Sequence, residues 1–302
     1  MGLAGIFQRF WPKPVSGGAL PSVLSADRGL FVVGAPRSGT TILQNALNHS
    51  SAVFLLGEAN LHLESGEGNF AARYNARYQS LSHQKTKSTF CPPVLKVDGT
   101  SEDYLNRLGQ SYRWVGAKVV INNLHSPDWV ERLTRYQCER FYQAHYLFTF
   151  RHPLAAIHST RDLQLITSHE PDPVARLLDN YLQSVQLFLC AVRNLSHVRA
   201  VFHEDMNAEK MQGIGAWLGV DLSEAAAYYD NARVRSYETS AFEGDDRIRI
   251  ERIAELYVAL RREASAGFAT PQIEQTDTHL SPTHYTALGR LDKQVRELRR
   301  YQ

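Results

Sequence analysis

A short stretch with two glycines carries the clearest chemical signal in this sequence. In GAPRSGTT, four residues separate Gly34 from Gly39, and the apolar run 30–33 comes directly before. Glycines at this spacing let backbone N–H groups turn inward around oxygen atoms, and a following helix directs the positive end of its dipole at them. A strand before the loop and a helix after it are the context that a phosphate-binding loop requires. The stretch therefore predicts a site for a phosphate or a similar oxyanion.

The loop departs from the pattern of ATP- and GTP-binding loops at one position. Thr40 stands where those loops have a lysine after the second glycine, and the nearest cation is Arg37. In those enzymes the lysine, with a following Ser or Thr that binds Mg²⁺, holds the β- and γ-phosphates. The absence of the lysine favours a nucleotide with a different terminal group.

These residues resemble a known loop. GAPRSGTT is similar to the 5′-phosphosulfate loop of the sulfotransferase family, whose donor is 3′-phosphoadenosine 5′-phosphosulfate (PAPS). Family members have Lys or Arg at the position of Arg37, in contact with the phosphosulfate. The resemblance implies that the donor is bound here by Arg37, Ser38, Gly39, Thr40 and Thr41.

A donor with a 3′-phosphate needs a second anion site, and YLFTFRHPLAAIHS offers one. Arg151 stands at the end of an expected strand, and Ser159 follows eight residues later, about two helical turns on. Family members resemble this arrangement, with both residues on the 3′-phosphate of the donor and of its product, 3′,5′-adenosine bisphosphate. Arginine suits the task because its planar fork pairs with two phosphate oxygens.

Sulfuryl transfer also needs a base for the acceptor hydroxyl and cations near the transferring group. Glu58 in LLGEANLH is the expected base. Tyrosylprotein and several bacterial carbohydrate sulfotransferases are similar there, with a Gly-Glu at about this distance after the loop. His62 is the rival base, since many cytosolic family members use a histidine. Lys118 joins Arg37 as a catalytic cation by resemblance; the alternative is a strand lysine whose head group reaches the surface.

The chain must place these residues with alternating strands and helices. Strands are expected at 30–34, 52–56, 94–97, 115–121, 145–150 and 198–202, and helices at 126–140, 172–193, 207–218, 247–264 and 287–300. This alternation predicts an α/β fold with three layers, a central parallel sheet flanked by helices, and binding at the carboxyl ends of the strands. The resemblance adds that the fold is the P-loop NTPase-like fold of sulfotransferases. We expect one domain over 29–302 after an N-terminal arm, 1–28.

Two further segments have open interpretations. Residues 60–93 are polar and aromatic with poor periodicity, which is typical of a lid or a substrate loop. Their aromatic and basic residues either stack on an acceptor ring or sugar or simply pack: Phe70, Arg73, Tyr74, Arg77 and Tyr78. In VFHEDM, which resembles a strand-end Tyr-Glu-Asp of the family, Glu204 and Asp205 are expected to brace loops or to cap the helix at 207.

Composition excludes several classes of protein. The 302 residues carry 33 basic and 31 acidic side chains, so no general nucleic-acid-binding face is expected. The three cysteines have no short spacing, and no residues have the spacing of metal ligands, so we expect reduced thiols, no metal and a cytoplasmic location. No apolar run is long enough to span a membrane, although aromatic and basic residues of the arm 1–28 leave peripheral membrane contact as an alternative to a packed arm.

The sequence therefore predicts a sulfotransferase that moves a sulfuryl group from PAPS to a hydroxyl of a carbohydrate or another small metabolite. One alternative is a P-loop metabolite kinase, which would need Mg²⁺ and ATP, and against which the missing lysine argues. A second alternative is a non-catalytic nucleotide-binding protein. It would bind the donor but would not depend on Glu58.

Overall fold

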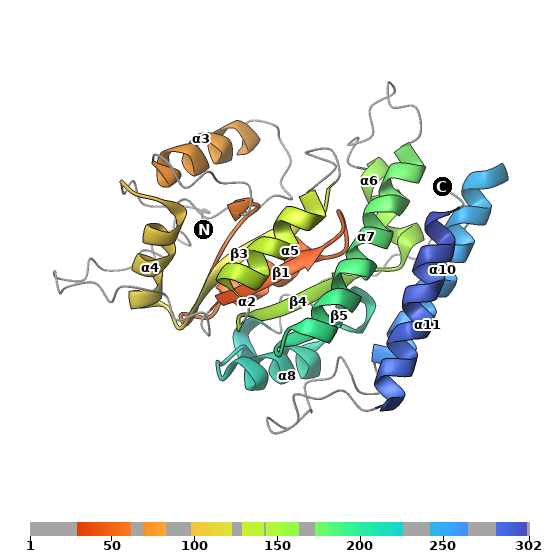
Figure 1. Cartoon of the computed structure of the whole chain (residues 1–302). Coiled ribbons are helices and arrows are strands. Elements are labelled where there is room, and N and C mark those ends of the chain that lie inside the picture. The colour runs from red at the N-terminus through yellow and green to blue at the C-terminus, as the bar shows by residue number, and fades with distance from the viewer. Residues whose placement is uncertain are drawn as a thin grey trace.

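A parallel sheet forms the centre of the molecule (Figure 1). The computed structural model describes residues 29–61, 69–82, 98–122, 129–141, 143–162, 173–225, 242–264 and 282–300. Within these residues the strands are β1 (Gly29–Gly34), β2 (Val53–Leu56), β3 (Trp114–Val120), β4 (His145–Phe150) and β5 (Val198–Phe202). Their order is β2-β3-β1-β4-β5, and every neighbouring pair is parallel, as the alternating pattern predicted. The expected arm at 1–28, the expected strand at 94–97 and His62 lie outside the described residues.

The strand order fixes where a ligand can bind. From β1 the chain crosses to β2 and β3 on one side of the sheet and later to β4 and β5 on the other. Such a reversal opens a crevice at the carboxyl ends of the central strands. The loop that follows β1 lies at this point, between the ends of β3 and β4.

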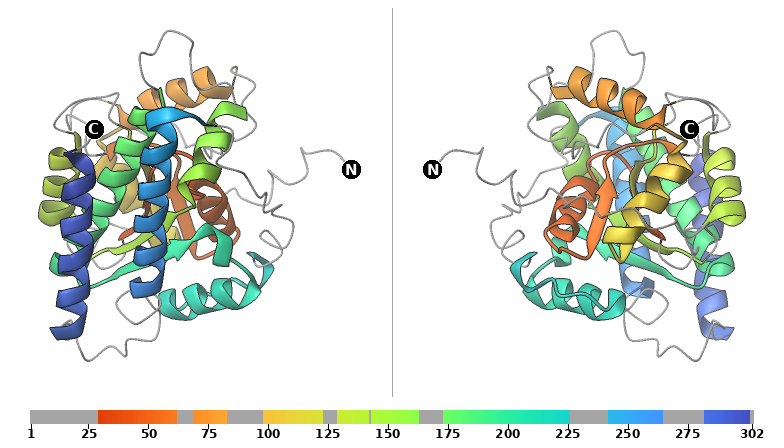
Figure 2. Two further views of the ribbon diagram at one scale, coloured as in Figure 1. Left: turned by 90° about the vertical axis from the view of Figure 1, so that its right-hand side faces the viewer. Right: turned by 90° about the vertical axis from the view of Figure 1, so that its left-hand side faces the viewer.

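Helices cover both faces of the sheet (Figures 1 and 2). One face packs on α2 (Thr40–Asn48) and α8 (Ala208–Leu218). The opposite face packs on α5 (Trp129–Arg140), α6 (Pro153–Asp162) and α7 (Pro173–Asn194), with α10 (Gly244–Glu263) and α11 (Pro282–Arg299) lying against α7. The three-layer α/β architecture predicted from the sequence is therefore confirmed.

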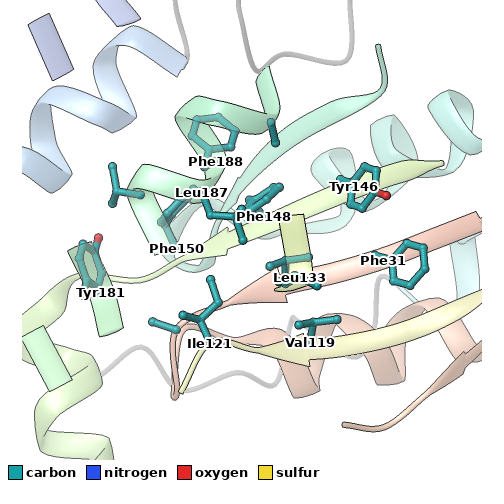
Figure 3. Close-up of a cluster of buried hydrophobic side chains, with 14 of the residues drawn as sticks. Phe31, Val119, Ile121, Leu133, Tyr146, Phe148, Phe150, Tyr181, Leu187 and Phe188 are labelled. Atoms are coloured by element: carbon teal, nitrogen blue, oxygen red, sulfur yellow. The ribbon is translucent and has the colours of Figure 1, made fainter. Parts of the chain in front are cut away.

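Two cores follow from the alternation of side chains along each strand, since successive residues point to opposite faces. Aromatic and branched residues of the strands meet α5 and α7 on one face (Figure 3): Phe31, Val119, Tyr146, Phe148, Leu133 and Phe188. The second set of strand residues packs on α2 and α8: Leu30, Val32 and Leu147 lie in one cluster with Leu43 and Leu47 of α2 and Met211 of α8. Lys118 belongs to the second set by position in β3, so its side chain is directed toward the layer of α2.

Two helices were not expected. Helix α3 (Phe70–Ser82) lies within the segment 60–93, which was predicted to have no regular structure, and α4 (Ser101–Ser111) follows it. The segment of α3 mixes apolar and polar residues without a clear helical period, and among its described side chains Phe70, Ala71 and Tyr74 are buried. For α4 a sequence signal existed, since Thr100 and Asp103 form a capping box.

The helices of the described residues differ from membrane-spanning helices in length or in hydropathy. None of them combines sufficient length with sufficient apolar character to cross a membrane. Several are strongly polar on one side, as expected of helices that cover a sheet and face water. Helix α7 is an example, with Val174, Leu178, Tyr181 and Val185 buried at three- and four-residue steps.

Candidate active site

The loop after β1 is held against the end of β4. The hydroxyl of Ser38 donates to the carbonyl oxygen of Ala35 at 2.7 Å. Oγ of Ser38 also lies 2.8 Å from Oγ1 of Thr149, within hydrogen-bonding distance. A Cβ on Gly34 would collide with both hydroxyls, so only glycine allows the loop to approach the strand this closely. The Ser38 hydroxyl, together with the Ser38 backbone N–H, which also donates to the carbonyl oxygen of Ala35 at 3.2 Å, therefore fixes the loop.

Helix α2 begins at the loop with an uncapped amino end. Its N-cap residue, Gly39, has φ +101° and provides no side-chain hydrogen bond, and the first turn contains no acidic residue. The first N–H groups of a helix have no partner within the helix, and the dipole makes this end partly positive. Arg37, which precedes Gly39 by two residues, also has a left-handed backbone, with φ +66°. This end of α2 therefore has the free N–H donors and the partial positive charge that an anion would need, and the anion site stays a prediction.

Lys118 joins the helix to the predicted base. Its side chain is 0% exposed, and its Nζ donates to Oγ1 of Thr41 at 3.0 Å and lies 2.9 Å from Oε1 of Glu58. The head group therefore does not reach the surface, which excludes the alternative interpretation of this lysine. Glu58 remains 28% exposed, so its carboxylate is accessible from outside. The sequence analysis assigned Lys118, Thr41 and Glu58 to one site, but it did not predict that Lys118 contacts the other two.

The turn that carries Glu58 is strained. Glu58 and Asn60 have φ values of +39° and +50°, in a region that residues other than glycine rarely adopt. Tyr74 of α3 supports the turn, because its hydroxyl accepts a hydrogen bond from the N–H of Gly57 at 2.9 Å. Strain of this kind persists where the surroundings hold it and is common at functional sites. Sequence reasoning missed this role of Tyr74, and no local pattern could have indicated it.

The two predicted anion motifs meet in space. Nε of Arg37 donates to Oγ of Ser159 at 3.0 Å, although 122 positions separate the residues. Ser159 lies on α6 and is 9% exposed, so the contact is largely shielded from water. The pairing brings the loop after β1 and the helix after β4 together at the carboxyl edge of the sheet.

Arg151 follows β4 directly and is half-buried. Among the residues that the structure describes, its guanidinium makes no hydrogen bond or ion pair. His203, after β5, lies between Arg151 and the loop: its Nδ1 is 2.9 Å from the position that a Cβ on Gly39 would occupy. Burial lowers the pKa of His203, and the charge of Arg151 lowers it further, which favours a neutral ring. His203 is a site residue that the sequence analysis did not select.

The remaining residues that the sequence analysis singled out, in the segment 60–93 and in VFHEDM, have structural contacts or lie outside the described residues. Phe70 and Tyr74 are buried at 1% and 5% exposure, so both pack in the core and do not stack on an acceptor. The side chains of Arg77 and Tyr78 lie outside the described part of the chain. Glu204 and Asp205 brace neighbouring elements, as expected, whereas the cap of α8 is Asn207.

Comparisons with known proteins identify the family of this chain. The model of a family described as the sulfotransferase family matches residues 29–224, more than half of the chain. No protein with a curated description matches the chain significantly. Among solved structures, the chain is similar to the crystal structure of sulfotransferase STF9 from Mycobacterium avium, with 16% identity, 69% of this chain and 68% of that chain covered, and a TM-score of 0.41. The family match contains every described site residue above and ends before α10.

Proposed function

This chain belongs to the sulfotransferase family, and from that premise we propose that it transfers a sulfuryl group from PAPS to a hydroxyl of a carbohydrate or another small metabolite. In this reaction a bond forms between the acceptor oxygen and sulfur, and the bond between sulfur and the 5′-phosphate oxygen breaks. Glu58 takes the proton of the hydroxyl, and 3′,5′-adenosine bisphosphate leaves. Most of the catalysis comes from positioning and electrostatics.

The residues of the site fit a ligand with two separate anionic groups. The uncapped amino end of α2 suits the 5′-phosphosulfate, since the first N–H groups of a helix have no partner within the helix and the end is partly positive. Arg151, which has no polar partner in the described part of the chain, suits the 3′-phosphate. Ser159, on the helix that follows Arg151, is bonded to Arg37 of the loop.

Lys118 and Arg37 have the positions of electrostatic catalysts in this proposal. An ammonium group has three N–H donors, and Glu58 and Thr41 engage two of those of Lys118. The third can donate to an oxygen of the transferring group. Because Lys118 is fully buried, its charge acts in a medium of low dielectric constant, where it stabilises developing negative charge more strongly than in water.

Glu58 is the proposed base, and its partial exposure lets an acceptor hydroxyl reach the carboxylate. The strained turn and Tyr74 hold it in place. His62, the rival base, lies outside the described residues and stays the alternative. A small acceptor is the proposal that the family resemblance favours.

The observation that carries the proposal is the hydrogen bond between Arg37 and Ser159, because it joins the two anion motifs in one site. A thermal-shift comparison tests it. We expect 3′,5′-adenosine bisphosphate to raise the melting temperature more than ATP with Mg²⁺ does at the same concentration. A larger shift with ATP and Mg²⁺ would favour a kinase and contradict the proposal.

Two variants then test the assigned roles. Arg151→Ala should weaken binding of 3′,5′-adenosine bisphosphate by about tenfold or more, as measured by calorimetry, because a charge-assisted pair is lost. Glu58→Gln should lower turnover by about a hundredfold and leave this affinity nearly unchanged. Normal turnover of Glu58→Gln would transfer the role of base to another residue, and unchanged affinity of Arg151→Ala would remove the second anion site.

A further inference from the structure

We propose that Tyr257 of α10 is a positioning residue that acts through Glu204 to orient Arg151, and so sets the preference of the site for nucleotides with a 3′-phosphate. The inference rests on the proposed function, because it assigns the 3′-phosphate to Arg151. It concerns a helix that begins after residue 224, where the family match ends. Nothing in the family match therefore assigns a role to Tyr257.

Both oxygens of the Glu204 carboxylate are in use. Oε1 accepts a hydrogen bond from the backbone N–H of His152 at 2.8 Å, and Oε2 accepts one from the hydroxyl of Tyr257 at 2.6 Å. One carboxylate thus connects the strand end of β5, the residue after Arg151 and helix α10. Hydrogen bonds to an ionised acceptor are stronger than neutral ones, so the connection is stiff.

The bond to His152 acts directly on Arg151. The N–H of His152 belongs to the peptide unit that joins Arg151 to His152, so holding this N–H fixes the orientation of that unit. His152 precedes Pro153, where α6 begins, and a residue before proline has a restricted backbone. The direction in which the side chain of Arg151 leaves the backbone therefore depends on Glu204.

Tyr257 is a rigid support for this carboxylate. It is 2% exposed, and its ring contacts the rings of His152 and Phe202 edge-on, with centroids 5.5 and 5.8 Å apart. Burial, together with the charge of Glu204, raises the pKa of Tyr257 far above its ordinary value, so the phenol stays protonated and donates. One helical turn later, Arg261 pairs with Asp205 and fixes the same face of α10 to the same segment.

The consequence for binding follows from the lack of other contacts. Among the described residues no acidic or hydrogen-bonding partner holds the guanidinium of Arg151, so its orientation relies on the backbone that Glu204 fixes. The side chain of Arg151 is then already oriented before a ligand binds, so less conformational entropy is lost on binding. Loss of the Tyr257 hydroxyl would leave Oε2 of Glu204 without its donor and free the carboxylate to turn away from His152.

Calorimetry with two nucleotides that differ only in the 3′-phosphate tests the inference. We expect the wild-type protein to bind 3′,5′-adenosine bisphosphate about tenfold or more tightly than adenosine 5′-monophosphate. Tyr257→Phe should reduce this ratio by about fivefold, the equivalent of one hydrogen bond, and leave the affinity for the monophosphate unchanged. Glu204→Ala, a second variant, should reduce the ratio at least as much.

Tyr181→Phe is the matched control. Tyr181 lies near Tyr257 and Glu204 and is 3% exposed, but its buried hydroxyl has no hydrogen-bond partner among the described residues. Removal of this hydroxyl should leave the ratio unchanged, whereas a general loosening of the α10 region would alter the binding of both nucleotides in both tyrosine variants.

The outcomes separate this inference from the proposed function. If Arg151→Ala abolishes the preference for the bisphosphate while Tyr257→Phe and Glu204→Ala retain it, the positioning role is wrong and the proposed function stands. If the wild-type protein binds the two nucleotides equally, the proposed function itself fails. A reduced ratio in Tyr257→Phe but not in Tyr181→Phe supports the positioning role.

Discussion

The ion pair of Glu58 with Lys118 predicts an unequal response to the loss of either partner. Lys118 is 0% exposed, whereas Glu58 is 28% exposed, and their charged atoms lie 2.9 Å apart. At an effective dielectric constant of about 20, charges at this distance attract each other by about 6 kcal/mol. This attraction offsets the cost of burying the ammonium group.

Glu58→Ala should therefore be the more damaging change. Among the described residues it leaves the buried ammonium group with only the hydroxyl of Thr41, and the loss of one partner of a buried pair costs about 3–5 kcal/mol. Lys118→Met leaves a carboxylate that water can reach, and methionine fits the space of a lysine stem. We expect its cost to be about 1–2 kcal/mol. The double variant should be close to Lys118→Met, because no charge is then buried alone.

Urea denaturation followed by circular dichroism measures these differences, with the midpoint of unfolding compared at unchanged slope. The reasoning is refuted if Glu58→Ala destabilises no more than Lys118→Met, or if the double variant is as unstable as Glu58→Ala. The experiment also shows how much of any loss of activity in the Glu58 and Lys118 variants comes from the chemistry and how much from stability.

Three further predictions concern pH, packing and metal. Burial, with the charges of His197 and Arg199, lowers the pKa of His145 to about 3. The unfolded state takes up this proton near pH 6.5, so stability is complete above that pH and falls as the pH decreases toward 3. We expect a loss of about 2 kcal/mol between pH 7 and pH 5, visible as a lower urea midpoint and reduced in His145→Asn. Gly116→Ala should cost about 3 kcal/mol or more in the same assay, because its Cβ would collide with the backbone carbonyl of Leu30, and a wild-type midpoint would contradict the packing. EDTA should leave sulfuryl transfer unchanged in a product assay, and strong inhibition would indicate a metal-dependent reaction.

Local patterns were sufficient for most of the fold. The runs at 30–34, 145–150 and 198–202 form strands as predicted, because continuous apolar residues suit strands buried on both faces. The long helix at 173–194 was equally clear, since its apolar residues recur at three- and four-residue steps. Helix α3 was missed because its sequence shows little helical periodicity. Helix α4 was missed although a capping box marks its start and its buried residues, Ser101, Tyr104, Leu105 and Leu108, recur at three- and four-residue steps.

Within the site, the sequence by itself determined the loop. Gly39 is needed for a local reason, because its backbone is left-handed, whereas Gly34 is also required by a tertiary contact, because a side chain there would collide with Thr149 at the end of β4. Their spacing, the strand before them and the helix after them are all contained in one stretch of chain. That is why an anion site could be predicted there without knowledge of the rest of the fold.

Only the tertiary structure decided which residues surround that loop. Lys118 reaches both Thr41 and Glu58 because β3 lies between β1 and β2, an order that no neighbouring residues specify. In the same way Tyr257 contacts Glu204 across 53 positions because α10 packs over the ends of β4 and β5. Strand order and helix packing depend on how the whole chain buries its apolar surface. The contacts that hold the site together follow from that burial and not from any single motif.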